Sequence, residues 1–313
     1  MHTFQIGEND AGQRADKFLL KACPNLPKSL LYKAFRKKDV KANGKRIPPE
    51  TFLQAGDVLQ VYLPEDCFAK KSSPAAPMRR LPDPVIVYED DDIAILHKPV
   101  NLPVHADDSG STDTLITRFL QHLRDTGAYD PDTEQSFVPA LCNRLDRNTE
   151  GLVIGAKNAA ALRCINEKIR LGEITKEYLC ITAGIPPKDE DTVSAYHKKP
   201  EGRPAVIRET PGDGFHAIKT GYRVLHKKGD LALVRVRLYT GRTHQIRAQM
   251  AALGCPVLGD MRYGNRTLNE KYGKSYQLLC AFRVTLDFSG EPCPLLHLRG
   301  KSWEITPEFA AMI

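Results

Sequence analysis

Residues 29–38 combine apolar and basic positions with a helical period. Their apolar side chains recur three and four residues apart and share one helical face, while the Lys and Arg side chains fall on the other. Residues 40–47 contain Asn43-Gly44, a dipeptide whose preference for positive φ angles is typical of a type I′ hairpin turn. A further apolar run lies within residues 56–63. The start of the chain therefore predicts an amphipathic helix, a hairpin and a strand.

From residue 84 onwards, short apolar and β-branched runs are mixed with a few helical patterns. Prolines make residues 98–105 an extended segment. Thr112 or Asp113 is expected to cap a helix whose apolar positions lie within residues 115–123. This mixture predicts an α+β domain with a mixed, mostly antiparallel sheet. The other elements are expected as strands at residues 85–88, 93–96, 152–154, 176–181 and 231–238, and as helices at about residues 159–170 and 248–253.

The composition changes between Glu65 and Pro84, where Lys, Ser, Ala and Pro predominate. Such a stretch has too little apolar surface to order itself, so it predicts a flexible linker. We therefore expect three parts: a small domain at residues 1–64, a linker at residues 65–83 and a large domain at residues 84–313.

The overall composition is that of a soluble globular protein, with 42% hydrophobic and 27% charged residues in 313. No apolar run approaches the length of a membrane span, and the first residues lack the features of a signal peptide, so a cytoplasmic location is expected. The eight cysteines form no C-x-x-C pair, which argues against a zinc site and against a disulfide framework.

Positive charge is concentrated near the start of the chain. The whole sequence carries a net charge of +7, and residues 1–64 hold eleven Lys and Arg against six Asp and Glu, a net +5. A basic small domain suggests a polyanionic partner, although a solvated surface would have the same composition. The side chains expected to contact the phosphates of such a partner are Lys28, Lys33, Arg36, Lys37 and Lys38.

One acidic residue stands out as a candidate for chemistry. Asp146 lies between Arg144 and Arg147, shortly before the apolar run at residues 152–154. Nearby guanidinium groups favour the ionised form of a carboxylate and can also hold phosphates, and the strand gives a rigid support. The alternative is an ordinary ion pair in a loop. Cys142 has no evident His partner, which argues against a thiol nucleophile.

A second polar cluster occupies residues 241–247, Gly-Arg-Thr-His-Gln-Ile-Arg, between a predicted strand and a predicted helix. Donors at the start of a helix can bind an anion, whereas the alternative is a polar turn without function. His244 has no second His, Cys or carboxylate at ligand spacing, so no metal site is expected.

Three stretches in this order resemble the motifs of the RluA family of pseudouridine synthases: residues 144–151, Lys176-Glu177-Tyr178-Leu179 and residues 241–247. The N-terminal segment is similar to the S4 RNA-binding domain carried by some members. The resemblance implies a small S4-like domain linked to a catalytic domain that isomerises uridines in RNA. It also implies that no cofactor is needed, and the sequence has neither a G-x-G-x-x-G after a strand nor a phosphate-binding loop.

The resemblance also assigns roles to residues. Asp146 is implied to be the essential acid, as nucleophile or as base, with Tyr178 stacking on the flipped uracil and Arg247 pairing with Asp146. Core packing is the alternative for Tyr178. The implied partner is 23S-type ribosomal RNA or its assembly intermediates, and the protein is expected to be a monomer. The residues implied to position RNA are Arg144, Arg147, Arg242, His244 and Gln245.

Two positions depart from the family's usual pattern. Asn143 stands where a His is usual, and Glu150 stands where a Ser is usual. Asn can donate a hydrogen bond but cannot titrate, so proton transfer at position 143 is not expected. Two other functions stay open: a glycosidase using Asp146 and Glu150 as paired carboxylates, and a non-catalytic RNA-binding factor in ribosome assembly.

Overall fold

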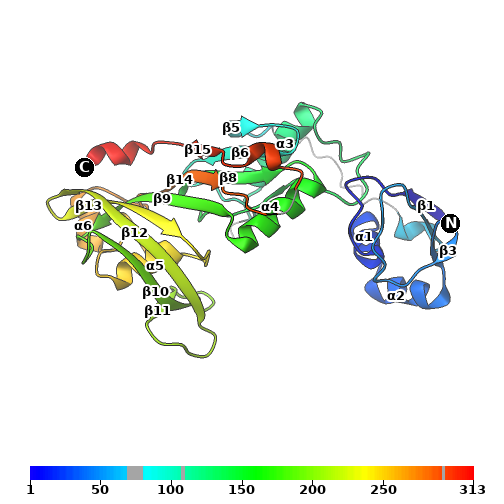
Figure 1. The fold of residues 1–313 in the computed structure, drawn as a ribbon, viewed down its shortest axis with the longest axis horizontal. Coiled ribbons are helices and arrows are strands. Elements are labelled where there is room, and N and C mark those ends of the chain that lie inside the picture. Colours follow the sequence, from blue (N-terminus) through cyan, green and yellow to red (C-terminus); the bar gives the residue numbers. More distant parts are fainter. Residues whose placement is uncertain (69–79, 107–109, 291–292) are drawn as a thin grey trace.

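The computed structural model describes residues 1–68, 80–106, 110–290 and 293–313, arranged around two separate sheets (Figure 1). Residues 69–79, the middle of the expected linker, lie outside the described residues, so the flexible linker stays a prediction. The first residues of the expected linker form a short 3-10 helix, Glu65–Cys67. Cys67 is buried in the core of the small domain.

The small domain is a four-stranded sheet in the order β1-β4-β2-β3, with α1 and α2 packed against it. The predicted hairpin is present, because Asn43 and Gly44 have φ angles of 52° and 75°. The apolar face of α2 is buried in the core, as its period predicts. The elements are β1 (His2–Gln5), α1 (Ala15–Ala22), α2 (Lys28–Lys37), β2 (Val40–Ala42), β3 (Lys45–Arg46) and β4 (Val58–Val61).

The large domain contains an eleven-stranded sheet with the central order β11-β10-β12-β13-β9-β14-β8-β6-β5. Among the described strands only β14 and β8 run parallel, which confirms the expected α+β fold with a mixed, mostly antiparallel sheet. The strands are β5 (Val85–Glu89), β6 (Ile93–Lys98), β7 (Ala140–Leu141), β8 (Glu150–Ala156), β9 (Ile174–Ala183), β10 (Glu190–Lys198), β11 (Val206–Arg208), β12 (His216–Lys228), β13 (Leu231–Leu238), β14 (Leu279–Leu286) and β15 (Ser302–Glu304).

Helices cover both faces of this sheet (Figure 1). In β6, Leu96 packs on the face covered by α3 (Leu115–Asp125), whereas Ile95 packs on the face covered by α4 (Ala159–Leu171). Both faces of a central strand therefore need apolar side chains, which explains why this stretch is continuously hydrophobic rather than alternating. The α3 face also carries α5 (Gln245–Ala252), the helix that follows the polar cluster. A sixth helix, α6 (Arg266–Lys271), lies near the C-terminal end of the chain.

One predicted helix start is wrong. The cap of α3 is Thr114, not Thr112 or Asp113. The Thr114 Oγ1 accepts from the Thr117 N–H at 3.2 Å, and the Thr117 Oγ1 accepts from the Thr114 N–H at 2.9 Å, a reciprocal pair that satisfies two free donors at the helix end. Within the described residues, none of the helices has the length and apolarity that crossing a bilayer requires.

Gly151 allows β8 to lie very close to its neighbouring strand β14. Its φ angle is 133°, a backbone conformation that residues with a side chain rarely adopt. A Cβ atom at this position would lie 2.5 Å from the backbone of Ala281. The two residues are partners in the parallel pairing of these strands. A glycine is therefore required here, a few residues after Asp146.

The small domain contacts the large one through polar side chains. Asp10 is 3% exposed, and its carboxylate accepts from Ser136 Oγ at 2.5 Å and from Gln135 Nε2 at 3.0 Å. Asn9 donates to Glu134 Oε1 at 2.7 Å. These bonds join the small domain to the large one in this structure.

Lys98 ties the extended segment after β6 to the loop that contains Asp146. Its side chain is fully buried, and Nζ donates to the carbonyl oxygens of Pro99 at 2.9 Å, Leu102 at 2.8 Å and Arg147 at 2.8 Å. Burial lowers the pKa of Lys98 to about 7, opposed by the carboxylates of Asp146 and Glu150. The loop is thus held by a buried amine, and burial raises the free energy of its charged form.

This burial predicts a pH-dependent stability. Between about pH 7 and the ordinary Lys pKa of 10.5, the unfolded chain binds more protons at Lys98 than the folded protein, so the free energy of unfolding rises with pH in this window. The rise should reach up to about 1.4 kcal/mol per pH unit. We expect urea unfolding to show it in the wild type and not in Lys98→Met. A difference between the two proteins that does not change with pH would mean that the three carbonyls keep the ammonium charged.

Candidate active site

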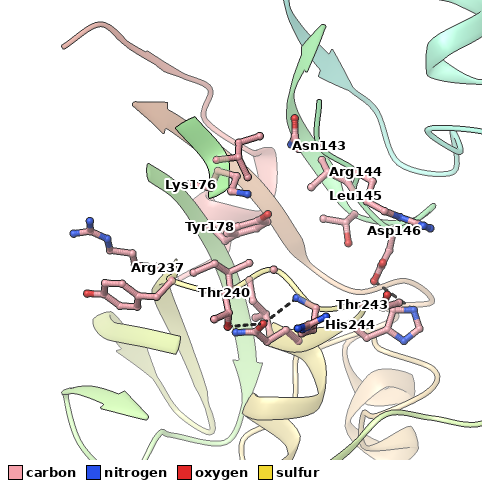
Figure 2. A pocket seen from close by; sticks show the side chains of 18 of the residues that line it. Asn143, Arg144, Leu145, Asp146, Lys176, Tyr178, Arg237, Thr240, Thr243 and His244 are labelled. Atoms are coloured by element: carbon pink, nitrogen blue, oxygen red, sulfur yellow. Dashed lines mark hydrogen bonds and ion pairs between the residues drawn. The ribbon is translucent and has the colours of Figure 1, made fainter. Parts of the chain in front are cut away.

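A cavity of about 530 Å³ opens beside the start of α5, and its lining also includes Ile169 and Gly172 at the end of α4. It is lined by the loop that follows β7, by the start of β9, and by the turn between β13 and α5. All three stretches identified in the sequence therefore contribute to one hollow (Figure 2). Of the predicted site residues, those that line it are Arg144, Asp146, Tyr178, Arg242, His244, Gln245 and Arg247.

Asp146 is fixed by a buried arginine. Arg247, in the first turn of α5, is 8% exposed and donates from Nη1 to Asp146 Oδ2 at 2.8 Å. The other side of the same guanidinium donates to both oxygens of Asp260, from Nε at 2.6 Å and from Nη2 at 3.0 Å. One planar group therefore bridges two carboxylates, which restricts where the Asp146 carboxylate can lie.

Asp260 is the buried carboxylate that holds Arg247 in place. It is 1% exposed, and its Oδ1 also accepts the N–H groups of Arg262 at 2.8 Å and Tyr263 at 3.0 Å. Burial alone would raise the pKa of Asp260, but the Arg247 ion pair and the backbone donors outweigh it and hold the pKa below its usual value. A permanently ionised Asp260 keeps Arg247 charged and oriented towards Asp146.

His244 lies next to the same oxygen of Asp146 that Arg247 contacts. It caps α5 with a φ angle of 60°, and its Nε2 lies 3.7 Å from Asp146 Oδ2. The Tyr263 hydroxyl accepts from the Ala205 N–H at 2.6 Å and lies 2.9 Å from His244 Nδ1. If that hydroxyl donates to Nδ1, Nε2 carries the hydrogen and turns it towards Asp146. Burial lowers the pKa of His244. The Asp146 carboxylate opposes this effect and the charge of Arg247 adds to it, and the net result is a pKa below the usual value, so the ring is neutral near pH 7.

Tyr178 forms a wall of the cavity from β9. It is 7% exposed and belongs to the core on the α3 side while also lining the cavity, so packing and cavity lining are combined in one residue. Figure 2 shows its ring between Arg237 and Asp146. Burial raises the pKa of the Tyr178 hydroxyl, and the Asp146 carboxylate adds to the effect, so the phenol is protonated at neutral pH.

The other predicted RNA contacts fall into three groups. Arg144 and Arg242 are exposed at the cavity, where they can reach a ligand. Arg147 does not line it, and its carbonyl oxygen accepts from Lys98. Gln245 is 2% exposed, with its amide bonded to Thr240, Thr220 and the Arg242 N–H, an arrangement that shapes the turn. The basic residues of α2, Lys28, Lys33, Arg36 and Lys37, and the following Lys38 are all exposed on the small domain.

The two unusual residues near Asp146 have local partners. Asn143 accepts the Ile154 N–H at 2.8 Å on its side-chain oxygen and so fixes the loop to β8. Glu150 lies 2.9 Å from His97 Nε2 and does not line the cavity. A glycosidase with Asp146 and Glu150 on opposite sides of a sugar therefore lacks its second carboxylate in the cavity. Burial raises the pKa of the Cys142 thiol to about 12, which leaves it a poor nucleophile.

Sequence reasoning missed Asp260 as the second partner of Arg247. The stretch around residues 256–264, which lies outside the three motifs, supplies this buried carboxylate and Tyr263. A lone Asp in a loop has no periodicity that would reveal its partner. Lys98 was likewise read as part of an extended segment only.

Comparison with known proteins identifies the family of this chain. Residues 92–252 match the family described as RNA pseudouridylate synthase. The chain is 35% identical over 266 residues to ribosomal large subunit pseudouridine synthase C of Vibrio cholerae, covering 83% of this chain and 80% of the relative. The protein of the same name from Escherichia coli is 34% identical over 273 residues, covering 85% and 81%.

A solved structure shares the fold. Human RNA pseudouridylate synthase domain containing 4 superposes with a TM-score of 0.57 at 22% sequence identity, covering 72% of this chain and 90% of the human chain. The family match, the relatives and the three motifs together confirm the resemblance to the RluA family. The chain therefore belongs to the RNA pseudouridylate synthase family and is an RNA pseudouridine synthase, an isomerase.

Proposed function

We propose that this enzyme isomerises uridines of large-subunit ribosomal RNA and that Asp146 performs the chemistry. The names of the Vibrio cholerae and Escherichia coli relatives support the substrate. The Asp146 assignment is supported chiefly by one observation, the direct bond from buried Arg247 to Asp146 inside the cavity. A cytoplasmic location fits such a substrate.

The reaction breaks the N1–C1′ bond of uridine, turns the base and joins C5 to C1′. The proton lost from C5 balances the one gained at N1, so neither water nor a redox partner is consumed. The base must first leave its stack, at a cost of a few kcal/mol. A cavity of about 530 Å³ is within the usual range for small-molecule sites and can take one nucleoside.

Asp146 can act as a nucleophile or as a base, and both roles need an ionised carboxylate. Arg247 donates to Oδ2 and leaves the second oxygen, Oδ1, without a bond to it. The neutral His244 ring beside Asp146 adds no competing charge. Tyr178 offers a flat, protonated ring as the wall against which the uracil stacks.

RNA outside the cavity would be held by positive charge. Arg144 and Arg242 are placed to contact the phosphates that flank the target uridine. The exposed basic face of α2 would bind a second part of the RNA, in the manner of the S4 domain that this segment resembles. Such contacts position the RNA and carry little sequence information.

The role of Asp146 predicts the behaviour of Asp146→Asn. This change keeps the size of the side chain and removes the charge, so we expect a melting temperature and an RNA affinity close to those of the wild type. Pseudouridine formation should fall below detection, because neither nucleophile nor base is left. Quantitative pseudouridine detection on total ribosomal RNA from a deletion strain measures it, with Asp213→Asn, an exposed loop position, as the matched control. Product from a folded Asp146→Asn protein would refute the assignment.

The basic face of α2 predicts a salt effect. Replacing Lys33, Arg36 and Lys37 by Ala should weaken binding to large rRNA fragments about 10-fold or more at 100 mM salt. The slope of log affinity against log salt should become shallower by roughly 0.7–0.9 per lost phosphate contact. Turnover of a short stem-loop should change little.

The matched control removes the same formal charge from the large domain, with Ala at the surface residues Lys188, Lys227 and Lys271. An equal loss of affinity in both triple variants would mean that overall charge, and not the α2 face, attracts the RNA.

A further inference from the structure

Tyr239 is a large aromatic residue that stays exposed beside the active-site cavity. It lies directly after β13, and 47% of its surface is accessible. It lines the cavity described above and also a second hollow of about 240 Å³ next to it. Arg237 lines both hollows as well, so these two residues form the boundary where one hollow meets the other.

The Tyr239 ring is held in place although it is exposed. The Arg237 guanidinium lies 5.0 Å from the ring centroid, and Lys219 Nζ lies 4.9 Å from it. Gly221 leaves room for the ring, since a Cβ atom there would come within 3.3 Å of Tyr239 Cε2. An exposed aromatic ring with two cations over it combines the groups that contact a nucleobase and its phosphate.

Arg237 differs from the arginines around it. Arg235 is paired with Glu177 and Arg223 with Glu190, so their charges are balanced within the protein. Arg237 donates to the Thr175 hydroxyl at 3.3 Å, and none of the carboxylates in the described parts of the chain forms an ion pair with it. Its charge is therefore available to an external anion.

We propose that Tyr239 and Arg237 form a second nucleotide subsite, in which Tyr239 stacks on the base next to the target uridine and Arg237 contacts the phosphate between the two. The subsite rests on the proposed function. Flipping one uridine removes a stacking partner from its neighbour, and an aromatic ring at the rim replaces it. Figure 2 shows Arg237 and Asp146 on opposite sides of Tyr178, so a strand whose uridine reaches Asp146 can continue towards Arg237.

A double-mutant cycle between protein and RNA tests the stacking. The RNA is the hairpin that the wild type binds most tightly among hairpins that tile large-subunit ribosomal RNA, each with one loop uridine. The flanking nucleotide on either side of that uridine is made abasic in turn. Tyr239→Ala should weaken the affinity for intact RNA by about 5- to 100-fold, whereas Tyr239→Phe should stay within about threefold of the wild type.

The decisive result is the coupling. On the RNA that is abasic at the stacked position, Tyr239→Ala should not weaken the affinity further. The base on which Tyr239 would stack is already absent from that RNA. Tyr276→Ala serves as the control, since Tyr276 is similarly exposed at 41% and lines neither hollow. An unchanged affinity in Tyr239→Ala, or the same loss on intact RNA and on both abasic RNAs, would overturn the subsite.

Affinity is measured by fluorescence anisotropy with the full chain, and a pseudouridine assay is run on the same RNAs. If the wild type binds but forms no pseudouridine, the proposed function fails while the coupling still decides the subsite. If product forms and Tyr239→Ala raises KM with kcat unchanged only on RNA that carries the base, both stand. Arg237→Gln should make the salt dependence shallower by roughly 0.7, unlike Arg223→Gln.

Discussion

The site depends on a single buried arginine held between two carboxylates. A buried guanidinium is stable only when a carboxylate pairs with it, and Asp260 is that partner for Arg247. Two backbone N–H groups in turn hold Asp260. The remaining Nη1 donor then points to one place, where Asp146 lies. Residues more than a hundred positions apart are thereby aligned through one planar group, which a flexible lysine could not do as well.

The sheet supplies the rigid frame for this group. The close pairing of β8 with β14 at Gly151 fixes the chain just after the Asp146 loop. Lys98 holds the same loop through its bond to the Arg147 carbonyl. Tyr178 extends from β9 on the same face that carries α5. These elements line the cavity together with the exposed Arg144 and Arg242.

Much of the fold and the site could be predicted because the signals are local. The apolar periods predicted α2, α4 and most central strands. The resemblance to the family's motifs predicted Asp146, Tyr178 and Arg247 as site residues, and the structure brings these three together in one cavity. The strand β12 was missed because its outer half is polar and exposed, so it lacks a continuous apolar pattern. Asp260 and the inward bonds of Gln245 could not be predicted, since each depends on a partner that only the tertiary fold brings near.

Asp260 is expected to be essential for the rate although it is buried behind Arg247 and does not line the cavity. The direct test is the single-turnover rate of pseudouridine formation by Asp260→Asn with enzyme in excess over RNA, below its melting temperature. We predict a loss on the order of 100-fold, because the released guanidinium no longer fixes Asp146, with RNA affinity unchanged. A folded Asp260→Asn protein that reacts at the wild-type rate would contradict the claim that this arginine bridge positions the catalytic carboxylate.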